Sequence, residues 1–303
     1  MRFQKLDLNL LVALDALLQE RSVSLAADRI HLSQSATSSA LGRLRDYFED
    51  ELLVLKGRSM VLTPRGEELI EPVRAVLDLI RSTIAIAQPF DPAISNRSIG
   101  IMASDYTVEV LLRRAMLEFA EEAPGITFEI MPLGDEVVEE LQRGRADLLI
   151  TIDTAISTEH PHEELWHDDF VVVGWSGNRA LADPLTRETY EELGHVTARF
   201  GWQRVPSFEE WALRSLSVQR RIEIVAPTFT SVASFLVGSQ RIATMHRRLA
   251  RRMAASMPLK IVEIPFQIPA IRQTAQWASS SDNDPAIKWL VKRLRQIAEL
   301  QDF

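Results

Sequence analysis

A run of small hydroxyl and amide side chains near the N-terminus has the composition of a surface that reads nucleic acid. It spans residues 33–45, and its first two turns hold mostly serine and threonine together with Gln34. Such residues are mediocre helix formers, so helix propensity does not explain them. A helix that enters the major groove by its N-terminus does explain them, because small side chains permit close approach, Gln34 can bond an adenine edge through two atoms, and hydroxyls can bond bases or phosphates. The alternative is a surface helix with a polar first turn.

Three helices and a hairpin are expected to position this run. Leucines recur at three- and four-residue spacing over residues 6–18, which predicts a first helix with one apolar stripe. Ser22 can cap a short second helix, and Ser33 can cap a third helix that runs to about Phe48. Two short strands, at residues 52–54 and 60–62, are expected to form a hairpin. Three helices followed by a hairpin wing are a familiar DNA-reading unit.

A long helix is predicted next, opened by Thr63 and Pro64, because proline is tolerated in the first turn of a helix. Its apolar residues follow the a/d spacing that lets one helix pack along another: Ile70, Val73, Leu77, Ile80 and Ile84. We expect this seam to dimerise the chain; the alternative is that the stripe packs only on the chain's own first helix. Pro72 lies inside the helix and should kink it or remove one backbone hydrogen bond.

After residue 97 strands and helices alternate, which predicts α/β domains with largely parallel sheets. Open α/β sheets bind ligands at the carboxyl ends of their strands, where helix N-termini offer backbone N–H groups. We expect an effector to bind between two such sheets, at Ser104, Asp105, Thr151, Asp153, Phe200, Trp202, Thr228 and Phe229. These groups suit a small polar ligand that is aromatic or carries a carboxylate. The alternative is that Ser104 and Thr228 only cap their helices.

Several short motifs share their order and spacing with one family of regulators. They are Ala26-Ala27, Leu32-Ser33-Gln34-Ser35, Leu52-Leu53-Val54 and Leu62-Thr63-Pro64-Arg65-Gly66, with Ser38, Leu41, Leu44 and Phe48 between them. Together they resemble the N-terminal signature of LysR-type transcriptional regulators. Asp7-Leu8-Asn9-Leu10-Leu11 is similar to the branch that contains nodulation-gene activators and regulators of aromatic catabolism. Residues 141–148 resemble the family's effector domain. The resemblance is strong over residues 6–66 and weaker afterwards.

The resemblance implies a winged helix-turn-helix over residues 1–63, a linker helix over 64–90 and an effector-binding domain over 91–303. That domain would be α/β with two lobes, like a periplasmic binding protein: lobe 1 at about 97–166 and 268–303, lobe 2 at about 167–267. DNA contacts would fall on Ser33, Gln34, Ser35, Ser38 and Ser39, with wing contacts near Lys56 and Arg58, and we add Arg43 as a phosphate contact. Many relatives have arginine where this chain has Ser39, and most lack a proline at the position of Pro72.

The function that this resemblance implies is sequence-specific transcriptional regulation controlled by a small-molecule inducer. Relatives that respond to aromatic compounds favour an aromatic inducer. The implied partners are double-stranded promoter DNA, the inducer, further copies of the chain in a dimer or tetramer, and RNA polymerase. No cofactor, metal or membrane is expected, and the sequence leaves open whether the chain activates or represses.

Composition argues against several other classes of protein. The chain has no cysteine, which rules out disulfides, thiolate zinc sites and cysteine nucleophiles. Its net charge of −8 argues weakly against a protein that coats nucleic acid, although residues 21–65 carry a modest basic excess. No apolar run approaches a membrane span of about 18 residues, and the start reads as an amphipathic helix, so the cytoplasm is expected. The common nucleophile, nucleotide and zinc signatures are missing, so we do not expect an enzyme.

Three further clusters could carry other chemistry. Residues 159–169 hold three histidines among carboxylates and could bind zinc, but a solvated loop is favoured. The six tryptophans could line an aromatic pocket, although core or lobe-interface positions are favoured for most: Trp166, Trp175, Trp202, Trp211, Trp277 and Trp289. The arginines of residues 241–252 could form a second nucleic-acid patch, but a solvated helix face is favoured. Residues 97–303 alone would also suit a solute-binding protein or a small α/β enzyme.

Overall fold

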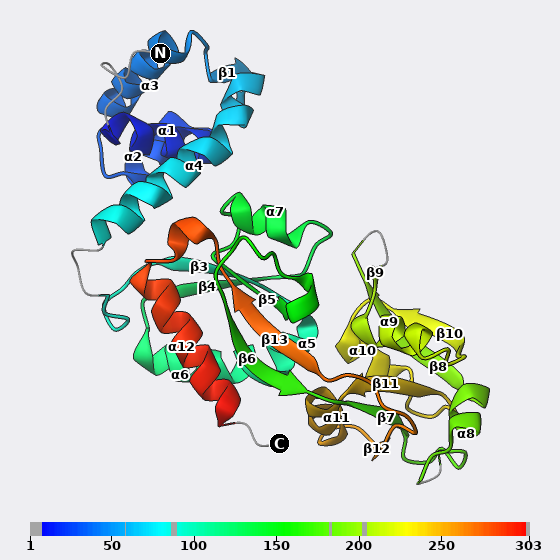
Figure 1. Ribbon diagram of the computed structural model, residues 1–303. Coiled ribbons are helices and arrows are strands. Elements are labelled where there is room, and N and C mark those ends of the chain that lie inside the picture. The colour runs from blue at the N-terminus through cyan, green and yellow to red at the C-terminus, as the bar shows by residue number, and fades with distance from the viewer. Residues whose placement is uncertain (1–7, 58, 86–89, 182–183, 202–204, 301–303) are drawn as a thin grey trace. The chain divides into compact units, whose positions relative to one another are not determined.

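The computed structural model describes residues 8–57, 59–85, 90–181, 184–201 and 205–300 of the 303-residue chain. The chain divides into two compact units, Met1–Gln88 and Pro89–Phe303, and each is described by itself (Figure 1). No helix in these ranges is long and apolar enough to cross a membrane.

The first unit is a three-helix head with a hairpin wing and a long fourth helix (Figure 1). Its elements are α1 (Leu8–Glu20), α2 (Val23–Arg29), α3 (Gln34–Phe48), β1 (Leu53–Lys56), β2 (Ser59–Leu62) and α4 (Pro64–Ala85), and the two strands pair antiparallel. Ser22 and Ser33 cap α2 and α3, as the sequence predicted, each accepting a hydrogen bond from a backbone N–H three residues on. The first wing strand begins one residue later and ends two residues later than expected.

The leucine stripe of α1 forms the core of the head. Leu10, Leu14 and Leu17 are each at most 3% exposed and belong to one cluster with residues of the other three helices and the wing. Each such side chain, when fully buried, contributes about 1.5–3 kcal/mol. Gly66 lets α4 approach the base of the wing, because a Cβ there would lie 2.5 Å from the carbonyl oxygen of Leu52. The helix α4 runs through Pro72 without ending there.

In the described residues the second unit contains a five-stranded sheet in one lobe and a six-stranded sheet in the other. The first has the order β4-β3-β5-β13-β6 and the second β10-β8-β11-β7-β12, with the short β9 paired to β8. The strands of the first sheet are β3 (Ser98–Ala103), β4 (Thr127–Met131), β5 (Leu148–Ile152), β6 (His162–Asp168) and β13 (Ile271–Gln276). Those of the second are β7 (Phe170–Trp175), β8 (Gly194–Phe200), β9 (Val205–Pro206), β10 (Arg221–Ala226), β11 (Ile242–His246) and β12 (Leu259–Val262).

Both sheets are mixed, whereas the sequence predicted largely parallel ones. In the first sheet β4, β3 and β5 are parallel, and β13 is antiparallel to both β5 and β6. In the second, β10, β8 and β11 are parallel, and β7 is antiparallel to β11 and β12. The reason is the double crossing between lobes: β6 continues into β7 and β12 returns to β13, so each crossing segment adds one strand to each sheet.

Helices cover the sheets and give each lobe its core. They are α5 (Asp105–Thr107), the π-turn η2 (Val108–Leu112), α6 (Arg113–Glu122), α7 (Val137–Gln142), α8 (Arg187–Glu192), α9 (Phe208–Ser215), α10 (Phe229–Ser234), α11 (Arg247–Ala254) and α12 (Pro285–Glu299), with the short turns η3 (Asp153–Ala155) and η4 (Ser279–Ser281). The helix expected over 108–121 is thus divided by a π-turn. α6 and α12 lie side by side over the first sheet (Figure 1).

One further expectation from the sequence was wrong. Residues 159–169 are not a solvated loop, because His162–Asp168 is strand β6, which pairs with β13 and buries Leu165 and Trp166. Trp211 is 60% exposed, whereas the sequence favoured core or lobe-interface positions for most of the tryptophans. Trp166 and Trp277 are buried, and Trp202 lies outside the described residues.

Candidate functional site

The outer face of α3 presents the polar side chains that the sequence singled out. The exposed residues are Ser33, Gln34, Ser35, Ser38, Ser39 and Arg43. Thr37, Leu41 and Leu44 occupy the opposite face and are buried in the head. The hydroxyl of Ser33 accepts a hydrogen bond from the backbone N–H of Ala36 at 3.2 Å, and this cap fixes the first turn that carries Gln34. The face therefore offers small polar groups on a rigid helix, as readout of base edges requires.

Two residues that the sequence analysis missed hold the wing in place. The guanidinium of Arg45 donates to the carbonyl oxygens of Glu51 at 2.9 Å and Leu53 at 2.8 Å, so it anchors the wing base. Asp50 accepts from the Thr63 hydroxyl at 2.6 Å and the Leu52 backbone N–H at 2.7 Å. The Thr63 and Leu52 hydrogen bonds lower the pKa of Asp50. Lys56 is exposed at the end of β1, while Arg58 lies outside the described residues.

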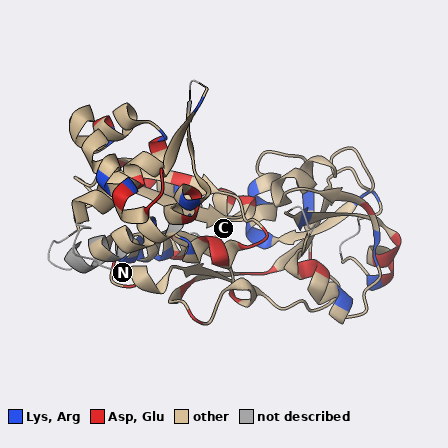
Figure 2. Cartoon of the chain, turned by 90° about the horizontal axis from the view of Figure 1, so that it is seen from above, with Lys and Arg blue, Asp and Glu red and all other residues tan. Residues whose placement is uncertain are grey.

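Several other basic residues of the head are neutralised by carboxylates of the same unit. Arg29 pairs with Glu20 at 3.1 Å. Arg65 pairs with Glu68 at 3.0 Å. Figure 2 shows Lys and Arg interspersed with Asp and Glu along the chain. Part of the positive charge of residues 21–65 is therefore paired with carboxylates of the head. Fewer arginines are available to contact DNA than the number in the sequence indicates.

The residues of the expected dimer seam on α4 differ in burial, and some of them pack in the core of the head. Val73 and Leu77 are 5% and 4% exposed and pack in the head core with Leu10 and Leu14 of α1. Ile70 packs against the same cluster, Ile80 is half-buried, and the side chain of Ile84 lies outside the description. For Val73 and Leu77 the structure thus favours packing on the chain's own first helix. On α1 and α4 the exposed apolar side chains include Leu8, Val12 and Val76, which are 54%, 38% and 44% exposed.

The ends of β3 and β10 meet where the two lobes face each other. The Asp105 carboxylate, just after β3, accepts hydrogen bonds from the backbone N–H of Phe229 at 3.2 Å and of Thr230 at 2.6 Å. Ser104 caps α5 and Thr228 caps α10, so both residues do serve as helix caps. The rings of Phe200 and Phe229 lie 4.7 Å apart. The structure therefore brings together five of the residues that the sequence singled out: Ser104, Asp105, Phe200, Thr228 and Phe229.

The other expected effector residues have different surroundings. Thr151 lies in β5 opposite Thr274 of β13. Asp153, in the turn after β5, forms an ion pair with Arg272 at 2.6 Å. Trp202 lies outside the described residues. Asp153 is consequently engaged at the sheet edge of lobe 1, rather than joining the cluster around Asp105.

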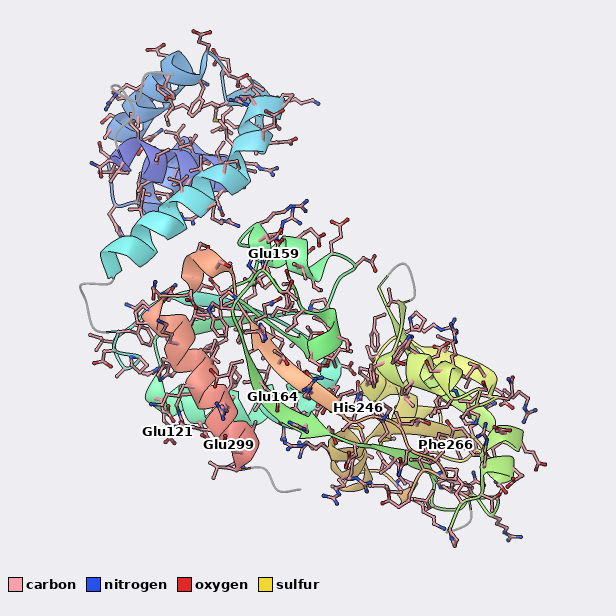
Figure 3. The ribbon with its side chains drawn as sticks, in the orientation of Figure 1. Glu121, Glu159, Glu164, His246, Phe266 and Glu299 are labelled. Carbon is pink, nitrogen blue, oxygen red and sulfur yellow. The ribbon has the colours of Figure 1, made fainter. Side chains whose placement is uncertain are left out.

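An aromatic and acidic cluster beside Asp105 escaped the sequence analysis. The Tyr106 hydroxyl donates to the Asp168 carboxylate at 2.7 Å, and its ring stacks on His246 at 4.1 Å. The His246 ring also lies 4.7 Å from that of Phe229. Figure 3 shows His246 at the junction of the two lobes. The residues come from α5, β6, α10 and β11, so only the packing of segments far apart in the chain could reveal the cluster.

Burial sets the protonation of this cluster. It raises the pKa of Asp168 to about 6, against the opposing hydrogen bonds from Tyr106 and the Arg248 backbone. It lowers the pKa of His246 to about 3, so the imidazole is neutral at neutral pH. The Nδ1 atom of His246 is buried and has no hydrogen-bond partner. The lobe junction thus contains a neutral histidine and a carboxyl group whose pKa is about 6, and both contact Tyr106.

The two alternative chemical clusters do not assemble into sites. Among the described residues no group of three or more His, Asp or Glu side chains could hold a metal ion. Three arginines of α11 have partners within their own unit, and two of these are ion pairs: Arg247 with Glu263 at 2.7 Å and Arg252 with Glu109 at 3.4 Å. Arg248 lies over the Trp166 ring at 5.9 Å. Their charges are largely offset, which argues against a second nucleic-acid patch.

These features define a class of protein. A head with an exposed polar helix and a wing reads DNA, and a two-lobed α/β unit with strand ends gathered at the lobe junction binds a small molecule. The chain is a DNA-binding transcriptional regulator under small-molecule control.

The chain belongs to the LysR family of bacterial regulators. Residues 8–67 match the family described as "Bacterial regulatory helix-turn-helix protein, lysR family". Residues 95–299 match the "LysR substrate binding domain". The sequence-based assignment to this family, and the fold class that it implied, are therefore confirmed.

Similar proteins include several named for nodulation. The chain is 44% identical over 290 residues to Nodulation protein D 1 of Rhizobium tropici, covering 96% of this chain and 94% of that protein. It is 45% identical over 304 residues to Nodulation protein D 1 of Sinorhizobium fredii, covering 100% and 94%. A solved structure of the probable transcriptional regulator PA0477 from Pseudomonas aeruginosa superposes with a TM-score of 0.76 at 28% identity, covering 97% of this chain and 98% of that one.

Proposed function

We propose that this regulator binds an aromatic inducer at the junction of its two lobes. The observation that carries the proposal is the convergence of aromatic rings beside the Asp105 contact: Tyr106 on His246, His246 on Phe229, and Phe229 on Phe200, with centroids 4.1, 4.7 and 4.7 Å apart. Aromatic rings favour stacked and edge-to-face partners, so an aromatic ligand inserted among these rings would find partners of that kind. Hydroxyls of Ser104 and Thr228 beside the rings would bond its polar groups.

The inducer-bound protein would act on DNA through α3 and the wing. Gln34 and the serines Ser33, Ser35, Ser38 and Ser39 would face base edges and backbone in the major groove, since all are exposed on one side of α3. Arg43, Lys56 and Arg58 would hold phosphates. Serine at position 39 removes the charged group that many relatives have there, so base preference should differ at that contact.

The remaining functional features are proposals of the same kind. We assign DNA binding to residues 1–63, the linker helix to 64–90 and effector binding to 91–303, and we expect a homodimer or tetramer in the cytoplasm that contacts RNA polymerase. Copies would meet through α4, with Val76 and the neighbouring apolar surface in place of the buried Val73 and Leu77. Because relatives carry the name Nodulation protein D, nodulation genes are the first promoters to test.

The test is DNA footprinting with and without aromatic compounds, on nodulation promoters and on the DNA upstream of the chain's own coding sequence. Phe229→Ala and Thr228→Val should abolish the inducer-dependent change while leaving basal binding nearly unchanged, because neither residue lies in the head. Trp211→Ala, which removes a 60%-exposed ring from the same lobe, is the control and should respond as wild type. Calorimetry that finds wild-type inducer affinity in Phe229→Ala and Thr228→Val would move the site elsewhere.

A further inference from the structure

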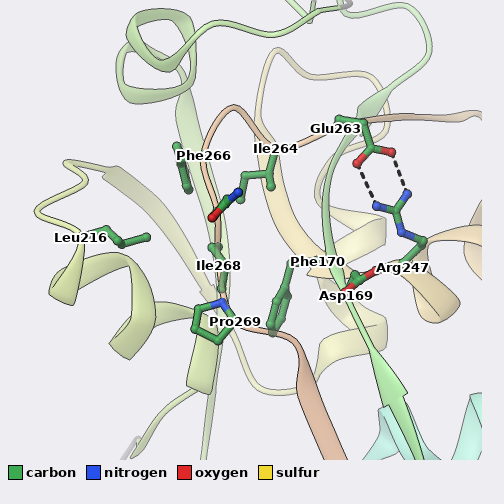
Figure 4. Close-up of a pocket in the computed structure, with 10 residues that line it drawn as sticks. Asp169, Phe170, Leu216, Arg247, Glu263, Ile264, Phe266, Ile268 and Pro269 are labelled. Carbon is green, nitrogen blue, oxygen red and sulfur yellow. Dashed lines mark hydrogen bonds and ion pairs between the residues drawn. The ribbon is translucent and has the colours of Figure 1, made fainter.

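A hollow lies beside the two segments that join the lobes, and we call it the hinge pocket. Its volume is about 570 Å³. It is lined by Asp169, Phe170, Leu216, Arg247, Glu263, Ile264, Phe266, Gln267, Ile268 and Pro269 (Figure 4). None of these residues belongs to the cluster around Asp105. Pockets of about 300–1,000 Å³ are typical of small-molecule sites, so the hollow is large enough for one.

Both chain crossings contribute to the hinge pocket. Asp169 and Phe170 lie where β6 passes into β7, and residues 263–269 form the return from β12 to β13. Leu216 adds a wall from the end of α9, where it is 40% exposed. The chain joins the two lobes only through these crossings, so a rotation of one lobe against the other must bend them. A molecule in the hinge pocket therefore contacts the segments that bend.

The lining selects against charged ligands. Six of its side chains are apolar, and the guanidinium of Arg247 is already held by both carboxylate oxygens of Glu263, at 2.7 and 2.8 Å. Asp169 adds a negative charge at the rim. An anionic ligand would meet the carboxylates of Asp169 and Glu263, and it would have to compete with Glu263 for the Arg247 guanidinium. The chemistry fits an uncharged molecule with an apolar body and a hydrogen-bonding group.

The floor of the hinge pocket is connected to the lobe junction. Phe170 is 4% exposed, and its ring lies 4.9 Å from that of His246, which in turn stacks on Tyr106 of lobe 1. The backbone N–H of Arg247 donates to the carbonyl oxygen of Asp169 at 2.8 Å, so one wall of the pocket is fixed to the outgoing crossing. A ligand that displaced the Phe170 ring would also displace His246, whose ring stacks on Tyr106 of lobe 1.

We propose that the hinge pocket is a second small-molecule site, for an uncharged amphipathic molecule, whose occupancy changes the closure of the two lobes. It is separate from the inducer site proposed above and does not depend on it. The inducer and the hinge-pocket ligand would then bind at distinct sites and act on the same movement of the lobes. Coupling between two sites requires such a shared conformational change.

The experiment uses the full chain and the neutral fluorescent probe N-phenyl-1-naphthylamine. Wild type should bind it saturably, and the anionic probe 8-anilinonaphthalene-1-sulfonate at least fivefold more weakly. Leu216→Trp should fill the pocket and raise the Kd of the neutral probe tenfold or more. Phe235→Trp is the matched control, because Phe235 is also a helix C-cap of lobe 2, is 42% exposed and does not line the pocket. Both variants change exposed residues, so both should fold, which circular dichroism checks.

The coupling to lobe closure has its own readout. Hydrogen–deuterium exchange at the Thr230 amide, which bonds Asp105 across the lobes, should change at least threefold when the neutral probe binds to wild type or Phe235→Trp, and not in Leu216→Trp. Wild-type probe affinity in Leu216→Trp would overturn the assignment of the site. Unchanged Thr230 exchange in the saturated wild type would overturn the link to lobe closure.

Discussion

The carboxylate of Asp105 accepts a hydrogen bond from the backbone N–H of Thr230 at 2.6 Å, and this contact joins lobe 1 to lobe 2. Asp105 follows β3 of the first sheet, and Thr230 lies in α10, which follows β10 of the second. One side chain therefore ties together the carboxyl ends of strands in two different sheets. Any movement that separates the two strand ends must break this contact.

Removing this carboxylate should loosen the lobes. Asp105→Ala loses hydrogen bonds to a charged acceptor, each worth about 1.5–3 kcal/mol, so the amides of Phe229 and Thr230 should exchange at least tenfold faster with deuterium. Asp153→Asn, whose carboxylate pairs with Arg272 within lobe 1, is the control and should leave these amides unchanged. Unaltered exchange in Asp105→Ala would show that the two lobes are held together by other contacts.

Gln34 should discriminate between base sequences. Gln34→Ala should weaken binding to the cognate duplex by about 1–3 kcal/mol and relax preference at one or two base pairs, because a bidentate contact to adenine is lost. Fluorescence anisotropy on cognate and scrambled duplexes measures this difference. Glu49→Gln, at the far end of α3, should leave the preference intact. Equal losses of Gln34→Ala on both duplexes would mean that this side chain does not read bases.

Lys56 should act through charge alone. Lys56→Ala should weaken binding to all DNA sequences and reduce the slope of log K against log salt by roughly one, since one phosphate contact releases about one counterion. The measurement is a salt titration of binding to two unrelated duplexes. A loss confined to the cognate duplex, or an unchanged slope, would contradict a phosphate contact from the wing.

Two adjacent residues of α4 separate dimerisation from folding. Leu77→Asp places an unpaired charge in the head core, where Leu77 is 4% exposed, and should unfold the head. Val76→Asp, at a position 44% exposed, should leave the head folded and reduce the oligomer to monomers. Light scattering gives the mass and circular dichroism the helix content. A wild-type oligomer in Val76→Asp would place the interface between copies on another surface.

Asp168 should make the stability of the second unit fall as pH rises from mild acid to neutrality. Burial raises the pKa of Asp168 from 3.8 to about 6, so its contribution to stability is fully present below pH 4 and is lost as pH rises through 6. Relative to Asp168→Asn, the wild-type free energy of unfolding should fall by roughly 3 kcal/mol between pH 4 and 7 and then stay level. Calorimetry of both proteins across this range checks the sign, and a difference that grows with pH would refute it.

The head could be predicted from the sequence because its determinants are local. Helix α1 follows from leucines three and four residues apart, and the caps at Ser22 and Ser33 bond backbone N–H groups three residues away. The alternation of strands and helices in the second unit could likewise be predicted from short apolar runs. Helix-cap and periodicity signals need no knowledge of which segments lie side by side.

The junction between the lobes was decided only by the tertiary structure. Asp105 and Thr230 are 125 residues apart, and Tyr106 and Asp168 are 62 apart, so no local pattern relates either pair. The antiparallel strands β6, β7, β12 and β13 arise because the chain crosses twice between lobes, and alternation of strands and helices does not record such crossings. The sequence by itself determined the elements, their caps and the family. Strand pairing determined which side chains meet at the hinge. Pairing distant strands costs chain entropy, and only long-range burial compensates that cost.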